Sequence, residues 1–226
     1  MPIIYPDSVT DLDALVEWAR IDDPADRERM RELTLEAEAR RGAAVYGNRV
    51  VDCVTGDDIA IGDVAFRARP LSRLFKPGMT IYPYVATCGR EMAEYGVGLT
   101  DPLERYWWDI IMQGAVGAAR KALFAAIERE AGYAPTSVSP GSIEMWPINN
   151  QPSLFALIGD VEGMIGVTIT ESFLMLPLKS VSGICFPGGG GFTHNCCLCE
   201  RKVCAGRQAP FDAKLKAQLE GELIHM

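Results

Sequence analysis

Residues Ile169–Phe186 read ITESFLMLPLKSVSGICF, and this stretch joins a polar turn to a β-rich run. Ser180–Phe186 carries Val, Ile, Cys and Phe between small residues, which is typical of a buried strand. Thr170, Glu171 and Ser172 have short or polar side chains that bind the local backbone where a strand ends. The stretch therefore predicts a turn that leads into a central strand.

Helical and β-rich patterns alternate over the rest of the chain. The longest expected helix begins at Asp101, because this residue is an N-cap, Pro102 follows it, and Glu104 stands three positions after the cap. Asp11 and Asp23 likewise stand where they can start two earlier helices, at 12–19 and 24–41. Further helices are predicted at 101–131, 153–157 and 211–224, and strands at 50–54, 80–86, 166–170 and 180–186. In the long helix, Gly114 and Gly117 favour close approach by another element.

Composition restricts the kind of protein. The chain has 226 residues, of which 48% are hydrophobic and 23% charged, enough for one folded domain with an added module. Its net charge of -8 argues against nucleic acid and anionic membranes as partners. Since no uninterrupted apolar run is long enough to span a bilayer and the first residues do not resemble a signal peptide, we expect a cytoplasmic protein with reduced thiols.

Four of the seven cysteines lie close together after the glycine run Gly188–Gly191. Cys196, Cys199 and Cys204 form a C-x2-C-x4-C pattern, and Cys197 adds a further thiol. A two-residue gap lets two sulfurs turn toward one centre, so the pattern predicts a metal site.

The spacing leaves the metal open. An iron-sulfur cluster, of the 4Fe-4S type, could use the four clustered thiolates, with Cys185 as an alternative fourth ligand. Zinc could instead bind three thiolates and His194.

Several segments together resemble a known family. These are Ser139-Pro140-Gly141, Trp146-Pro147, Gln151–Leu157 and Ile169–Gly183, and they resemble the activation domain of cobalamin-dependent methionine synthase. Ala86–Gly89 and the helix after it are similar to small stand-alone proteins built from that domain. The resemblance covers about 81–186.

The resemblance implies an α+β fold, a twisted and mostly antiparallel sheet flanked by helices. We expect this domain over 1–186, with a helical N-terminal part at 8–41, and a cysteine-rich loop and closing helix at 187–226. The family acts on corrinoids, so it implies an accessory protein that binds a corrinoid protein or corrinoid-dependent methyltransferase and assists its reductive reactivation. Because that reduction needs a low-potential electron, iron and sulfide suit this role better than zinc.

The same resemblance implies a cofactor groove formed by six residues, Ser139, Pro140, Gly141, Ser142, Glu171 and Ser172. The Arg and Tyr with which the family holds S-adenosylmethionine align with Ser137 and Ser142, which cannot clamp a carboxylate. This difference argues against S-adenosylmethionine as a ligand. An alternative is a metal-binding electron-transfer or interaction module on the same scaffold, without corrinoid or S-adenosylmethionine.

Four other chemically active side chains are expected to be structural. Cys53 and Cys88 stand in apolar, strand-like surroundings that favour small buried side chains. Asp109, within the long helix, favours solvent or a local hydrogen bond over a functional role. Lys179, in a turn, favours solvent.

Overall fold

The computed structural model describes residues 1–8, 11–143, 146–188, 195–204, 207 and 209–220. The chain divides into two compact units. Unit 1 comprises Met1–Tyr46, Val85–Ala126 and Asp160–Val181, and unit 2 comprises Gly47–Tyr84, Ile127–Gly159 and Ser182–Met226. The expected division into residues 1–186 and 187–226 stays a prediction. The two compact units are a different kind of division, because each combines three separate segments of the chain.

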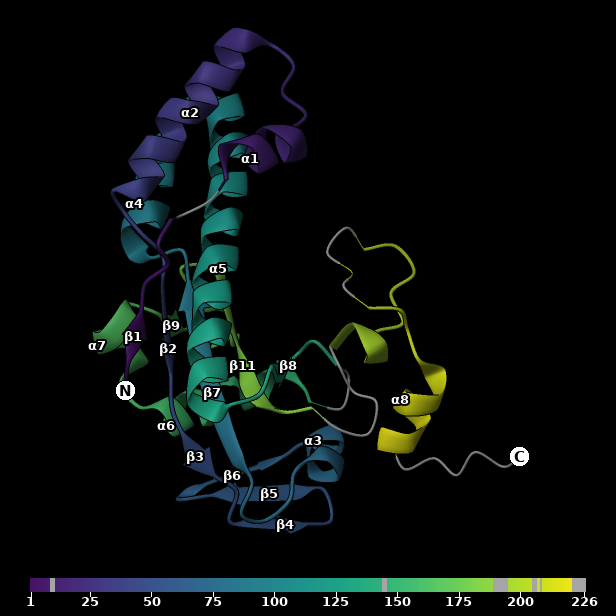
Figure 1. The fold of residues 1–226 in the computed structure, drawn as a ribbon. Helices are drawn as coiled ribbons and strands as arrows, with labels where there is room; N and C mark the ends of the chain where they lie inside the picture. Colours follow the sequence, from purple (N-terminus) through teal and green to yellow (C-terminus); the bar gives the residue numbers. More distant parts are fainter. Residues whose placement is uncertain (9–10, 144–145, 189–194, 205–206, 208, 221–226) are drawn as a thin grey trace. The chain divides into compact units, whose positions relative to one another are not determined.

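Unit 1 is built mainly from helices (Figure 1). Its elements are β1 (Ile3–Ile4), α1 (Leu12–Ala19), α2 (Pro24–Glu38), β2 (Ala43–Tyr46), α4 (Arg90–Gly98), most of α5 (Pro102–Ala131), α7 (Val161–Ile165), β9 (Thr168–Ile169) and β10 (Met175–Leu176). Its core gathers around Trp107 and Trp108 of α5, with Met30 and Leu33 of α2 and Met92 of α4.

Unit 2 carries most of the strands. Its elements are β3 (Arg49–Val50), β4 (Cys53–Thr55), β5 (Asp58–Ile61), β6 (Val64–Arg67), α3 (Arg69–Leu74), β8 (Pro135–Val138), η1 (Ile148–Asn150), α6 (Gln151–Ile158), η2 (Asn195–Leu198) and α8 (Ala213–Glu220). Most of β7 (Thr80–Thr87) and β11 (Ser180–Pro187) also belongs to it. Its core includes Trp146 stacked on Phe66, and Phe75 edge-on to Phe186.

The largest sheet has six strands in the order β1-β2-β7-β11-β8, with β3 also paired to β7. β4, β5 and β6 form a separate three-stranded meander, and β9 and β10 form a short hairpin. Each pairing whose register is defined is antiparallel, for example Ile184 with Val138. The α+β architecture with an antiparallel sheet and helices is therefore confirmed.

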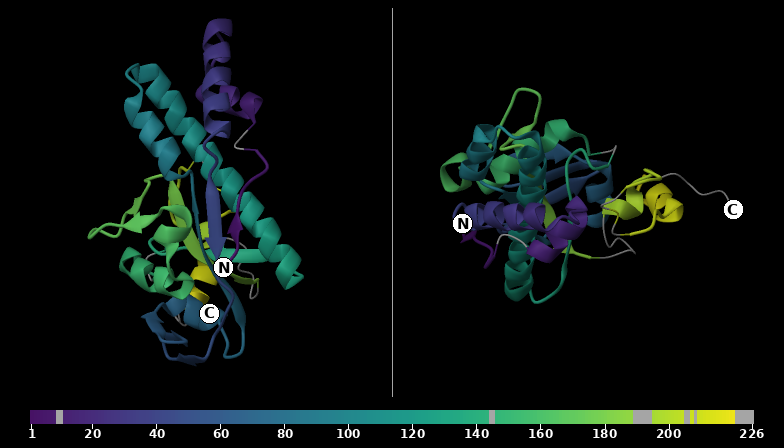
Figure 2. Two further views of the ribbon diagram at one scale, coloured as in Figure 1. Left: turned by 90° about the vertical axis from the view of Figure 1, so that its left-hand side faces the viewer. Right: turned by 90° about the horizontal axis from the view of Figure 1, so that it is seen from above.

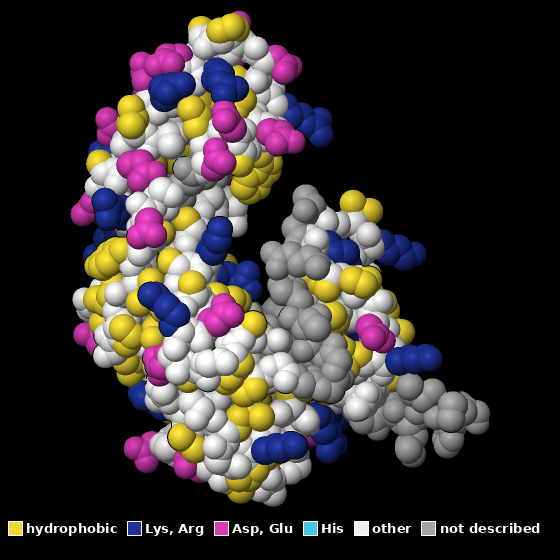
Figure 3. Space-filling view, viewed as in Figure 1, with side chains coloured by type: hydrophobic (Ala, Val, Ile, Leu, Met, Phe, Trp, Pro, Cys, Tyr) yellow, Lys and Arg dark blue, Asp and Glu magenta, His cyan; other side chains and the backbone are white. Residues whose placement is uncertain are grey.

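The helix starts follow the capping residues of the sequence. Asp11, Asp23 and Asp101 each accept hydrogen bonds from backbone N–H groups in the first turn of α1, α2 and α5. The helix ends were predicted less accurately than the starts: α2 ends at Glu38, whereas the sequence predicted an end near Arg41. Acidic and basic side chains are interspersed over α1 and α2 (Figure 3), as expected of a solvated face.

α5 is the one helix of the described residues that is long and apolar enough to cross a membrane by length and composition. A core helix meets the same criterion, and α5 contributes Trp107, Trp108, Ile111 and Ala115 to the core of unit 1. The close backbone approach lies on this buried face. A Cβ on Gly42 would stand 3.2 Å from the carbonyl oxygen of Ala115, whereas a Cβ on Gly117 would meet open space. The expectation of close approach at Gly117 is therefore wrong.

Gly183, in β11, offers a test of the packing of unit 2. A Cβ at this position would lie 2.5 Å from the carbonyl oxygen of Val138 and 3.0 Å from the Tyr84 ring. We expect Gly183→Ala to lower the free energy of unfolding by about 1–3 kcal/mol, because backbone on the neighbouring strand must move. Chemical denaturation checks this value.

Gly117→Ala is the matched control. The added methyl meets nothing within 4 Å in α5, so the variant should unfold with equal or greater free energy, by up to about 1 kcal/mol. Equal stability of Gly183→Ala and the unmodified chain would contradict the packing described for β11 and β8.

Candidate functional site

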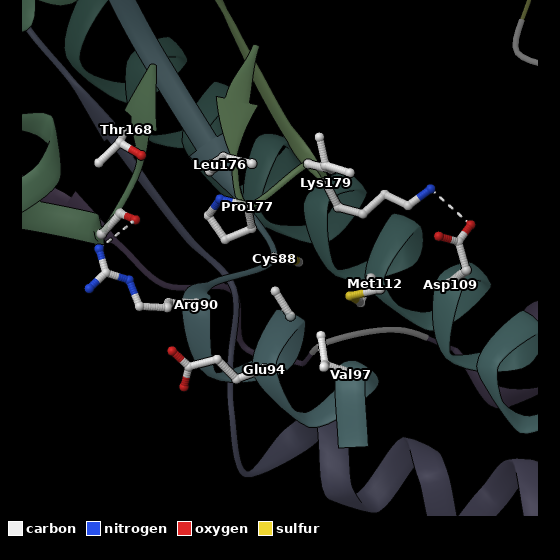
Figure 4. Close-up of a pocket in the computed structure, with 13 residues that line it drawn as sticks. Cys88, Arg90, Glu94, Val97, Asp109, Met112, Thr168, Leu176, Pro177 and Lys179 are labelled. Atoms are coloured by element: carbon white, nitrogen blue, oxygen red, sulfur yellow. Dashed lines mark hydrogen bonds and ion pairs between the residues drawn. The ribbon is translucent and has the colours of Figure 1, made fainter. Parts of the chain in front are cut away.

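Unit 1 contains a pocket of about 660 Å³, a volume suited to a small ligand or an inserted side chain. Its wall is formed mainly by apolar residues of α4, α5, the end of β10 and the segment after it, namely Ala93, Val97, Met112, Leu176, Pro177 and Leu178. Figure 4 shows Val97, Met112, Leu176 and Pro177 around an open centre, with Cys88 behind it. The pocket is thus an apolar hollow between two helices and a loop.

Charged groups stand at opposite ends of this pocket (Figure 4). At one end Lys179 Nζ donates to Asp109 Oδ2 at 2.8 Å. At the other end Arg90 lies 3.9 Å from Glu162 and donates to the carbonyl oxygen of Gly166 at 3.4 Å. The expectation that Lys179 is solvated is wrong, since its side chain is only 26% exposed and bonds a carboxylate 70 positions earlier in the chain.

The rim of the pocket exposes large apolar side chains. Val97 is 82% exposed and Leu178 is 70% exposed, and Leu176 and Leu174 of the adjoining hairpin are about half exposed. Figure 2 shows the β9–β10 hairpin, in green, reaching out from the ribbon. Exposed apolar residues that gather around a hollow and are bordered by charges are typical of an interaction surface.

Cys88 lines the pocket but is buried, as predicted. Its backbone N–H donates to the carbonyl oxygen of Lys179 at 2.9 Å. Burial raises the pKa of the Cys88 thiol from an ordinary value of 9.0 to about 11, so the thiol is protonated and unreactive near neutral pH. Cys53, by contrast, is exposed on β4, so the expectation that it is buried is wrong.

Glu171 and Ser172 form the tip of the hairpin between β9 and β10. Both are exposed, and neither lines the pocket. The Ser172 hydroxyl lies 3.0 Å from Thr170 Oγ1, and the Leu174 N–H donates to that same oxygen. The predicted strand end with local hydrogen bonds is confirmed, whereas cofactor binding by Glu171 and Ser172 stays a prediction.

Ser139, Pro140, Gly141 and Ser142 form a tight turn after β8 in unit 2. The Ser142 N–H donates to the carbonyl oxygen of Ser139 at 3.2 Å, and the Ser142 hydroxyl bonds the same oxygen. Gly141 has a φ of 76°, which explains why a glycine stands there. The six expected cofactor residues thus fall into two groups, one in each unit, and their binding role stays a prediction.

The cysteine loop belongs to unit 2 and leads from η2 toward α8 (Figure 1). Cys197 is 6% exposed and packs in the core that also holds Leu198, Leu215 and Leu219. Cys196 and Cys199 are partly buried on one turn, and Cys204 is exposed. Cys185 lies buried in β11, and His194 lies outside the described residues.

A metal centre on Cys196, Cys197, Cys199 and Cys204 stays a prediction. Among the described side chains, no three His, Cys, Asp or Glu groups are gathered around a common point. The thiol chemistry suits iron or zinc, but the burial of Cys197 fits core packing better than ligation.

Sequence reasoning missed the pocket itself. Asp109 and Lys179 were each recognisable as charged residues in apolar surroundings, but no local pattern joins two positions so far apart. The apolar segment MLPL, at 175–178, was the one local sign of this surface. Its two leucines follow a polar turn, and both are exposed in the structure.

The raised pKa of Cys88 predicts a loss of stability in alkali. Between about pH 9 and pH 11 the unfolded chain releases the Cys88 proton while the folded chain keeps it, so the free energy of unfolding falls as pH rises. A rise in the pKa from 9.0 to about 11 corresponds to about 3 kcal/mol of unfolding free energy. We expect Cys88→Ala to reduce this fall, whereas Cys53→Ala should leave it unchanged; denaturant titrations at several pH values measure it. Identical pH profiles for both variants would contradict the burial of the Cys88 thiol.

No family model matches the sequence, and no curated protein matches it. Among solved structures, the chain is similar to a crystal structure of the MetH reactivation domain bound to AdoHcy. The two are 16% identical and superpose with a TM-score of 0.58, over 82% of this chain and 78% of the other. This chain therefore has the α+β fold of the MetH reactivation domain, with a cysteine cluster near its C-terminus.

Proposed function

We propose that this protein is a cytoplasmic accessory factor of a corrinoid-dependent methyl-transfer system, which binds a corrinoid protein and assists its reductive reactivation. The observation that carries the proposal is the fold shared with the MetH reactivation domain over most of both chains. Fold alone does not determine function, so the site must supply the rest of the argument.

The apolar rim of the pocket in unit 1 is the proposed contact with the corrinoid protein. Val97 and Leu178 are largely exposed, and exposing apolar side chains to water is unfavourable. A partner that covers them would remove this apolar area from water. The ion pair of Lys179 and Asp109 and the guanidinium of Arg90 border the rim, where charges orient a partner.

The cysteine loop is the proposed metal centre. Thiolates of the loop would hold an iron-sulfur cluster, which supplies electrons at low potential when bound. Zinc would give a structural centre instead, because it has no redox chemistry. The loop is attached to the core of unit 2 through Cys197 and Leu198, so a bound metal would stand on a fixed base.

A second candidate function is an electron-transfer or interaction module that binds metal but no corrinoid. Ser137 is 3% exposed in β8, and the hydroxyl of Ser142 is bonded within its own turn. Neither side chain therefore offers the large charged or aromatic contact of the S-adenosylmethionine-binding relatives. This observation favours a protein that keeps the fold of the reactivation domain but does not bind S-adenosylmethionine.

Binding to a corrinoid protein tests the first proposal. The probe is the cobalamin domain of a methionine synthase loaded with cob(II)alamin, titrated anaerobically against the full chain. We expect Leu178→Glu to weaken binding by about 30-fold, because a hot-spot residue contributes about 2 kcal/mol and the new charge must be desolvated.

Leu35→Glu is the matched control, since Leu35 of α2 is 65% exposed and lies outside the pocket lining. It should bind as the unmodified chain does. No measurable binding by the unmodified chain would reject the corrinoid role and leave the metal-binding module as the better account.

Metal analysis distinguishes the two kinds of centre. Protein purified without oxygen should contain iron and acid-labile sulfide, and its visible absorption should bleach on reduction. Zinc in place of iron would exclude direct electron transfer by this loop. A metal-free protein that also takes up neither metal would remove the centre from the proposal.

A further inference from the structure

We propose that Arg207 organises the cysteine loop into a three-thiolate metal site formed by Cys196, Cys199 and Cys204, from which Cys197 is excluded. This inference rests on the proposed metal centre, and it identifies the ligands of that centre and the residue that positions them. The class of ligand is a single thiophilic metal ion, or one metal of an iron-sulfur cluster.

Arg207 is hydrogen-bonded to the main chain of all three cysteines. Its Nη1 donates to the carbonyl oxygen of Cys196 at 3.2 Å, and its Nη2 donates to that of Cys199 at 3.2 Å. Its backbone N–H donates to the carbonyl oxygen of Cys204 at 3.2 Å. The three positions of the C-x2-C-x4-C pattern are therefore linked to one residue.

The same guanidinium closes the loop at two further points. Nη1 donates to the carbonyl oxygen of Ala209 at 3.1 Å, and Nη2 donates to that of Arg201. A guanidinium can do this because it presents five N–H donors in one rigid plane, whereas a lysine ammonium is a single point with three donors. The loop therefore needs an arginine at this position and not merely a positive charge.

Cys197 is held by different contacts. Its carbonyl oxygen accepts from the Asp212 N–H at 2.8 Å, and Asp212 caps α8 through the Leu215 N–H. The residue is 6% exposed and shares its core with Leu215 and Leu219. Because its side chain is packed into this core, Cys197 serves packing and leaves ligation to the other three.

Arg207 fixes the backbone of the loop and leaves its side chains to be set by the metal. The described side chains do not yet converge on one point, and Cys204 is exposed. In the proposed site the metal gathers the three sulfurs when it binds, while Arg207 holds the backbone carbonyl groups of their residues.

The experiment uses the full chain and Zn²⁺ alone, titrated anaerobically against a chromophoric chelator. We expect Arg207→Lys to weaken zinc binding by about 10–100-fold, the usual effect of losing an outer-shell contact. Arg201→Lys is the matched control, because Arg201 is exposed and takes part through its carbonyl group. Zinc affinity of Arg207→Lys equal to that of the unmodified chain would overturn the role of Arg207.

Two cysteine variants test the ligand set. Cys199→Ser should lose zinc and keep its thermal midpoint, whereas Cys197→Ala should keep zinc and show a lower midpoint, because it removes a core side chain. Loss of zinc by Cys197→Ala would overturn the exclusion of Cys197.

Hydrogen exchange in the metal-free protein separates this inference from the proposed function. Arg207→Lys should speed exchange of the amides of Cys199 and Asp212, which donate within the loop, and Arg201→Lys should not. Unchanged exchange would overturn the organising role even if zinc binds. Binding of the cobalamin-loaded domain, measured on the same variants, reports on the corrinoid role independently, and a chain that binds corrinoid but no zinc would overturn the three-thiolate site alone.

Discussion

The packing of unit 1 depends on a position that has no side chain. A Cβ on Gly42 would stand 2.7 Å from the carbonyl oxygen of Thr87 and 3.2 Å from that of Ala115, so the start of β2, the end of β7 and α5 can approach closely there. Thr87 is followed by Cys88, which lines the pocket, and α5 supplies Asp109 to its mouth. The glycine therefore lets the end of β7 and α5, which both lead to residues of the pocket wall, lie close to the start of β2.

The sequence predicted those parts of the fold that depend on local chemistry. Asp11, Asp23 and Asp101 predicted three helix starts, since a capping carboxylate needs only its own first turn. The tight turn at Gly141 and the strand Ser180–Pro187 could also be predicted from local sequence. The antiparallel architecture came instead from the resemblance of longer segments.

The rest could not be predicted, because it depends on residues that are distant in sequence. The partner of Lys179 lies 70 residues away. Gly117 of α5 was expected at a close approach, but the approach to α5 is made by Gly42 against Ala115, since pattern alone does not show which face of a helix is covered. Cys53 was expected inside because its neighbours are apolar, yet β4 belongs to a small meander that exposes it. Among the cysteines of the loop, burial distinguishes Cys197, and spacing does not.

The division of the cysteine thiols between interior and surface determines which of them oxidise when the protein is exposed to air. Cys88, Cys185 and Cys197 are shielded by the core, while Cys53 and Cys204 are open to oxidants and Cys196 and Cys199 are partly so. Sulfenic acid would form first on the accessible sulfurs and would leave the packing of both units intact. Circular dichroism and gel filtration would then report a folded protein even though the cysteines of the loop are already oxidised. A count of free thiols is therefore the more informative test of sample quality.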